Sequence, residues 1–133
     1  MLTFVVTTAI INFMFFVSGI DKLFHFEKVV NGLAKRLGAL LPIAAYQLLI
    51  VGAIVIELAC PPVILYCAYR RSDRNNTLGF YASIALILFT VMATLFYHFP
   101  PTTSSKYYPF MSNLSLLGGL GLMAAVFYRN ALL

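Results

Sequence analysis

The sequence predicts an all-α integral membrane protein: a four-helix bundle with a short amphipathic interfacial helix between the first and second membrane spans. Hydrophobic residues make up 62% of its 133 residues and charged residues only 10%, against roughly a quarter charged in ordinary soluble domains. Four apolar runs are long enough, at about 1.5 Å per helical residue, to cross a hydrocarbon core of about 30 Å. We expect one transmembrane domain, residues 1–133, with spans at about residues 2–20, 46–69, 78–99 and 110–128.

The first run has no basic residue before it and no clear small-x-small cleavage site, so we expect a retained span rather than a signal peptide. It is followed by residues 26–41, whose apolar side chains recur at helical spacing while most charged side chains lie off that stripe. This pattern predicts the amphipathic helix in the membrane interface. Gly38 and Pro42 are suited to ending it and starting the second span.

The second span contains Glu57, the only charged residue inside an apolar run. A carboxylate at this depth costs several kcal/mol or more unless it is neutralised, paired or wetted, which makes it a candidate functional residue. Pro61 and Pro62 follow, and we expect them to disturb the helix and release the carbonyls of Glu57 and Leu58. Cys60 and Cys67 are seven residues apart, about 10 Å along a helix, which excludes a disulfide within the span.

The third span follows a polar turn in which Asn76 or Thr77 is expected to cap the helix. Its polar side chains fall on one helical face, and an imidazole stands at its end. For the hydroxyls alone, a hydrogen bond to the carbonyl one turn earlier is the simplest interpretation. The imidazole could instead exchange protons or bind a polar ligand group. These residues are Ser83, Thr90, Thr94, Tyr97 and His98.

Residues 102–109 are expected to form the last loop before the fourth span. Gly118, Gly121 and Ala125 form a small-residue face suited to close helix packing. Near the start of this span, Asn113 carries amide donors and an acceptor that hydrocarbon cannot satisfy, so it needs polar partners.

Alternating spans place the end of the first, the end of the third and the start of the fourth at one side of the bundle. Glu57 lies about 15 Å from that end of its own span. Polar side chains from several helices therefore converge, and the sequence predicts a polar pocket open to one side. The candidate ligand-binding residues are Glu57, Lys22, His98, Asn113, Thr94 and Tyr97.

Two interpretations of Glu57 remain open. In the structural one it is a neutral acid hydrogen-bonded across the bundle to Thr90, Thr94 or Asn12. In the functional one it binds a ligand or carries protons, with Lys22 or His98 as its partner. No residue is singled out as catalytic, and two isolated histidines and one buried acid lack the spacing of a metal site.

The net charge of +5 comes from basic residues beside span ends, where anionic lipid headgroups are the expected counter-charge, so we expect no nucleic-acid partner. Four basic residues lie on the side of the termini and five on the other. This count does not set the orientation. Lys22 and Lys28 have acidic neighbours, so we expect them to serve the structure rather than to set the orientation. We therefore expect both termini in the cytoplasm.

Four stretches resemble the DoxX family of small four-span membrane proteins: residues 16–23 (FVSGIDKL), Glu57-Leu58, residues 93–98 (ATLFYH) and residues 113–120 (NLSLLGGL). The resemblance implies a four-helix bundle. The chain departs from the family pattern at two places. One is Pro61-Pro62, and the other is Ser112, which stands where family members often have a basic residue before the asparagine. It also implies a set of family-like polar positions, namely Ser18, Gly19, Lys22, Glu57, His98 and Asn113.

Three functions follow as expectations. The first is an accessory or binding subunit that holds a quinone or lipid, or docks to a larger membrane assembly, and is not an enzyme on its own. The second is a quinone-linked oxidoreductase component, for which electrons must come from a partner because no cofactor motif is evident. The third is a purely structural protein of a large complex. Expected partners are membrane lipids and other membrane proteins or further copies of the chain.

Overall fold

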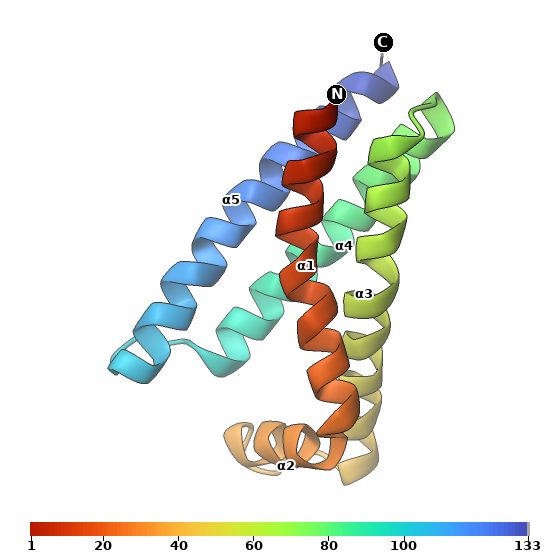
Figure 1. Cartoon of the computed structure of the whole chain (residues 1–133). Coiled ribbons are helices and arrows are strands. Elements are labelled where there is room, and N and C mark those ends of the chain that lie inside the picture. Colours follow the sequence, from red (N-terminus) through yellow and green to blue (C-terminus); the bar gives the residue numbers. More distant parts are fainter. Residues whose placement is uncertain (133) are drawn as a thin grey trace.

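A computed structural model describes residues 1–132, which form five helices and no strand. Four of the helices are long and apolar enough to cross a membrane, and the chain begins and ends at the same end of the bundle (Figure 1). The predicted fold class, a four-span helical membrane bundle with one short helix between its first two spans, is confirmed. The helices are α1 (Leu2–Phe24), α2 (Phe26–Arg36), α3 (Ile43–Tyr69), α4 (Asp73–Tyr97) and α5 (Ser104–Leu132).

Several predicted boundaries were wrong because polar residues extend the helices beyond the apolar runs. Helix α4 begins at Asp73, and its cap is Ser72, whose side chain accepts a hydrogen bond from the Asn75 N–H at 3.2 Å, rather than Asn76 or Thr77. Helix α5 begins at Ser104, so most of the predicted loop at 102–109 is helical.

The amphipathic helix α2 ends at Arg36, short of the predicted residue 41. Gly38 (φ 68°) and Ala39 (φ 52°) then turn the chain in the left-handed region. In α3, Pro61 and Pro62 lie inside a continuous helix, so they do not interrupt it.

The helices pack mainly as neighbours in the order α1, α3, α4 and α5, while α1 and α5 touch little. At the end of the bundle that carries the termini, Gly79 of α4 lies against the Phe127 ring of α5, where a Cβ would meet ring carbons at 2.7 Å. Toward the opposite end, α4 and α5 diverge from α1 and α3 (Figure 1). The bundle is therefore closed at one end and open at the other.

Helix α2 lies across the open end of the bundle, below α1 and beside the start of α3 in Figure 1. Its buried residues Val30 and Leu33 pack with Tyr46 and Ile50 of α3, while its charged side chains are exposed. Burial of these apolar side chains explains why the amphipathic helix packs against the end of the bundle.

Candidate functional site

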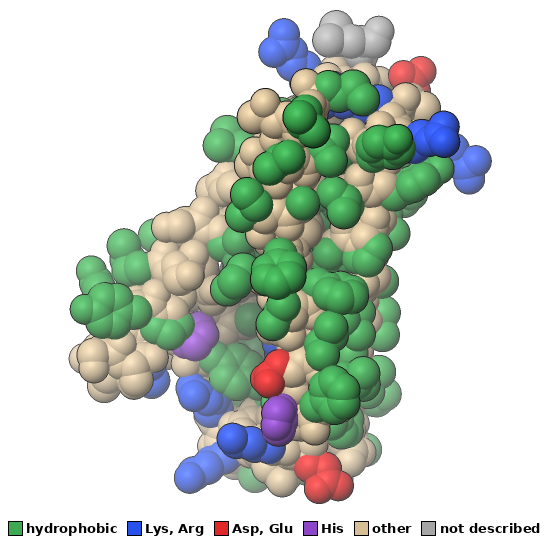
Figure 2. Space-filling model, in the orientation of Figure 1, with side chains coloured by type: hydrophobic (Ala, Val, Ile, Leu, Met, Phe, Trp, Pro, Cys, Tyr) green, Lys and Arg blue, Asp and Glu red, His purple; other side chains and the backbone are tan. Residues whose placement is uncertain are grey.

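The divergence of the helices leaves a cavity of about 800 Å³ between α1 and α3 on one wall and α4 and α5 on the other. Figure 2 shows the molecule hollowed on this side. Most lining side chains are apolar, and Leu48, Leu88 and Met92 among them are at least 50% exposed. Because these exposed side chains belong to the membrane-spanning helices α3 and α4, we take the cavity to open laterally, between the helices.

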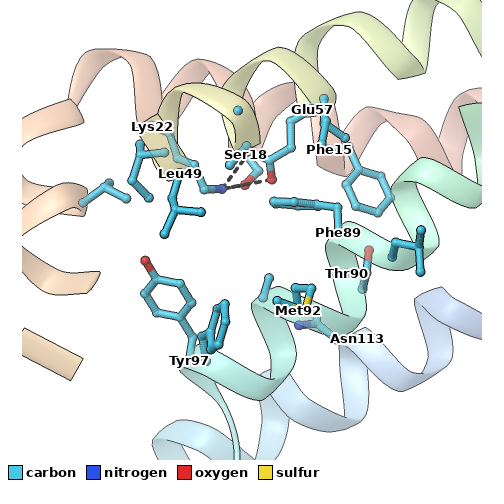
Figure 3. Close-up of a pocket in the computed structure, with 18 of the residues that line it drawn as sticks. Phe15, Ser18, Lys22, Leu49, Glu57, Phe89, Thr90, Met92, Tyr97 and Asn113 are labelled. Carbon is cyan, nitrogen blue, oxygen red and sulfur yellow. Dashed lines mark hydrogen bonds and ion pairs between the residues drawn. The ribbon is translucent and has the colours of Figure 1, made fainter. Parts of the chain in front are cut away.

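A salt bridge between α1 and α3 forms the polar part of the first wall (Figure 3). Both carboxylate oxygens of Glu57 lie 2.9 Å from Nζ of Lys22, which also donates a hydrogen bond to Oγ of Ser18 at 2.6 Å. The Glu57 side chain is 3% exposed and that of Lys22 is 21% exposed. Pairing cancels the two charges locally, which lowers the cost of holding them at this depth.

Gly19 explains how α1 and α3 approach closely enough for this salt bridge. A Cβ on Gly19 would lie 2.9 Å from Cδ2 of Leu58 and 3.0 Å from Cβ of Glu57. Only a residue without a side chain leaves room for this contact. One helical turn separates Ser18 from Lys22, so their side chains share the face that α1 turns toward Glu57.

Helix α4 adds an aromatic ring to the salt bridge. Nζ of Lys22 lies 5.9 Å from the centroid of the Phe89 ring, within the range of a cation–π interaction. In Figure 3 this ring lies beside the carboxylate and the ammonium group, at the boundary between the two walls. The Lys22 head therefore contacts three of the four membrane-spanning helices.

The second wall carries uncharged polar groups. Nδ2 of Asn113 donates to Oγ1 of Thr94 at 3.0 Å, which joins α5 to α4. Thr94 in turn donates to the carbonyl of Thr90 at 2.6 Å. The Tyr97 hydroxyl is buried without a hydrogen-bond partner among the described residues, and Figure 3 shows it pointing into the cavity toward the opposite wall. Its hydrogen-bonding capacity is therefore unused within the described chain.

The open end of the cavity is bounded by α2 and the C-terminus of α4. Nη1 of Arg36 donates to the carbonyl of Tyr97 at 2.7 Å, and its guanidinium lies 5.0 Å from the centre of that tyrosine ring. His98, which follows Tyr97, also lines the cavity. Burial, reinforced by the positive charges of Arg36 and Lys106, lowers the pKa of His98 below its ordinary value.

The structure divides the six predicted site residues between the two walls. Lys22 and Glu57 lie together on the first wall, and Tyr97, His98 and Asn113 line the second. Thr94 lies behind the cavity surface, where it binds the Asn113 amide. Five of the six therefore line one cavity, although the helix ends that carry them diverge.

The proposed structural partners of Glu57 were wrong. Asn12 instead donates to the carbonyl of Thr8 at 2.8 Å and contacts the sulfur of Met123 at 3.7 Å, in the core between α1 and α5. Thr90 donates to the carbonyl one turn earlier, at 2.7 Å, as the simplest interpretation of the hydroxyls predicted. The partner is Lys22, the first of the two that the functional interpretation named, and His98 lies on the other wall.

Two residues at the site were not predicted from the sequence. Phe89 carried no signal, because one phenylalanine in an apolar run is indistinguishable from its neighbours. Arg36 was among the charged residues expected largely off the apolar stripe of the amphipathic helix, although its place in the last turn suits it to contacts beyond the helix. Among residues 1–132, no group of three or more His, Cys, Asp or Glu side chains is placed to hold a metal ion.

A family model described as DoxX matches residues 9–99. The matched range contains Lys22, Glu57, Tyr97 and His98, while Asn113 lies beyond it. No curated protein and no solved structure matches the chain. Because the match spans more than half of the sequence and the fold is a bundle of four membrane-spanning helices, this multi-pass membrane protein belongs to the DoxX family.

Proposed function

We propose that this protein binds a small amphipathic molecule, a lipid or a quinone, and acts as a binding or accessory subunit within the membrane. The observation that carries the proposal is the lateral cavity of about 800 Å³ with the Lys22–Glu57 salt bridge in its wall. This volume falls within the range of about 300–1,000 Å³ that is typical of small-molecule sites. A ligand that enters from the bilayer must carry apolar surface, and these polar groups would orient its polar part.

Lys22 and Tyr97 both line the cavity, and each keeps an unused hydrogen-bond donor. A lysine ammonium has three donors, and Lys22 directs two of them to Ser18 and Glu57, which leaves one for the cavity. The Tyr97 hydroxyl has no partner within the described chain, and an unsatisfied buried polar group costs about 1–3 kcal/mol. A ligand oxygen that accepts from either group recovers part of that cost, which favours a head with carbonyl, hydroxyl or ester oxygens.

A quinone-linked redox component is the second candidate. It is favoured by the 2.9 Å hydrogen bond between Lys22 and Glu57, across which a proton can be passed beside the cavity. In this role the electrons come from a partner protein, and the chain supplies the quinone site and a proton path. This role predicts that a quinone copurifies with the protein and is reduced and reoxidised when a fraction containing the partner protein is added. A bound lipid would show no such redox change.

A pair of glycine substitutions tests the cavity. Gly52 lines it and Gly121 does not, and at both positions an added Cβ meets nothing within 4 Å. We expect Gly52→Phe to fill the cavity and Gly121→Phe to add the same bulk to the lipid-facing surface of α5. After gentle purification, native mass spectrometry should show a bound amphiphile in the wild type and the Gly121→Phe control but not in Gly52→Phe. Retention of the amphiphile by Gly52→Phe, with helix content unchanged, would refute the proposal.

A further inference from the structure

Three cationic or titratable side chains from three different elements lie beside the open end of the cavity, where His98 lines it and Arg36 contacts the lining residue Tyr97. Arg36 stands at the end of α2, His98 follows α4, and Lys106 lies in the first turns of α5. Arg36 binds the carbonyl and ring of Tyr97, whose ring centroid is 6.4 Å from that of His98, and the charges of Arg36 and Lys106 both help to lower the pKa of His98. Figure 2 shows a histidine and Lys or Arg side chains together at the edge of the hollow. We name these three residues the cationic rim.

The cationic rim has no acidic counterpart within the described chain. The chain has four carboxylate residues, and the two ion pairs among residues 1–132 join Glu57 to Lys22 and Asp21 to His25. Neither pair involves Arg36 or Lys106. The interior of the cavity is therefore neutral in sum, because its lysine is paired, whereas its rim carries uncompensated positive charge.

The geometry of Arg36 leaves its charge available. One of its N–H groups binds the Tyr97 carbonyl, and a guanidinium has five donors in a planar fork that suits phosphate oxygens. The residue is exposed, so the remaining donors can be reached from the membrane interface. Its contact with the Tyr97 ring holds the guanidinium at the end of α4, next to His98.

We propose that the cationic rim of Arg36, His98 and Lys106 binds the phosphate of an anionic phospholipid whose acyl chain occupies the lateral cavity. This assignment rests on the proposed function and names the class of its ligand. The apolar cavity is continuous with the positive rim, which favours a lipid over free phosphate. A lipid can place its acyl chain against the apolar lining, whereas free phosphate leaves the cavity without a matching occupant. The ester oxygens of such a lipid lie between phosphate and chain, where the Tyr97 hydroxyl can donate to them.

The test uses the full chain in nanodiscs containing equal amounts of phosphatidylglycerol and phosphatidylcholine with identical acyl chains. Native mass spectrometry then counts the lipids retained after release from the disc. We expect the wild type to retain phosphatidylglycerol preferentially and Lys106→Gln to reduce that preference about five-fold, the equivalent of about 1 kcal/mol for one interfacial charge. Lys28→Gln and Lys35→Gln are the controls, because both remove an exposed charge of α2 outside the rim.

Arg36→Gln should reduce the preference similarly. Because Arg36→Gln also removes the contact between α2 and α4, Lys106→Gln is the variant that tests the charge by itself. A preference lost equally in Lys28→Gln and Lys106→Gln would show attraction by net charge alone and overturn the assignment. So would inorganic phosphate that stabilises the detergent-solubilised protein while phosphatidylglycerol is not enriched. If Gly52→Phe abolishes retention of both lipids but Lys106→Gln leaves the preference intact, the cavity proposal stands and the rim assignment fails.

Discussion

Removing one partner of the salt bridge should destabilise the bundle more than removing both. Lys22→Met leaves the Glu57 carboxylate, which is 3% exposed, without its ammonium partner at 2.9 Å. Breaking a buried ion pair in this way typically costs about 3–5 kcal/mol. Because the Lys22 side chain is 21% exposed, solvent and headgroups screen part of the interaction, and we expect a loss near the lower limit, about 3 kcal/mol.

The double variant Lys22→Met/Glu57→Leu replaces the pair by apolar side chains of comparable size. Such replacements are often neutral or stabilising, so the double variant should recover most of the stability lost in the single one. The free energy of unfolding, measured for all three proteins in the same detergent micelles, gives the comparison. The reasoning is refuted if Lys22→Met unfolds within about 0.5 kcal/mol of the wild type, or if the double variant is less stable than the single one.

Two further predictions concern helix packing and pH. Gly19→Ala should cost about 1–3 kcal/mol, because its Cβ would lie 3.0 Å from Cβ of Glu57; Gly118→Ala, with open space around it, should be neutral or slightly stabilising in the same unfolding assay. The pKa of His98 is lowered by burial, Arg36 and Lys106, so it is neutral at pH 7 and gains charge as the pH falls through that lowered value. Retention of phosphatidylglycerol should therefore increase as the pH falls through that lowered pKa, and a wild-type preference that does not change with pH, as in His98→Gln, would contradict this.

The spans were predictable because hydropathy and length are properties of the local sequence. Their ends were not, because helices extend into polar segments: α4, capped by Ser72, begins at Asp73, five residues before the predicted span, and α5 begins at Ser104, ahead of Pro109. The placement of polar residues at one side of the bundle was also predictable, since alternating spans fix which helix ends lie on the same side.

The pairing of individual side chains could not be predicted, because it depends on how each helix is rotated about its axis. Glu57 faces Lys22 rather than Thr90 because Gly19 lets α1 pack closely against that face of α3. The back-bonded hydroxyl of Thr90 is the second cause, since it leaves that group without a proton to donate to the carboxylate. The first cause is a contact between helices, which a single apolar sequence does not encode in its hydropathy, whereas the second is a hydrogen bond within α4.

Stability alone does not account for a charged pair at this position. An apolar pair of similar volume would hold α1 and α3 together about as well, and the polar core contact of Asn12 with Met123 shows that the bundle also packs polar groups away from the cavity. The salt bridge, in contrast, lies in the cavity wall with the Lys22 head partly exposed. A purely structural role predicts that the folded Lys22→Met/Glu57→Leu variant still retains its amphiphile. A binding role predicts that this variant folds but no longer retains the amphiphile. The same double variant therefore tests both the energetics of the salt bridge and its role in binding.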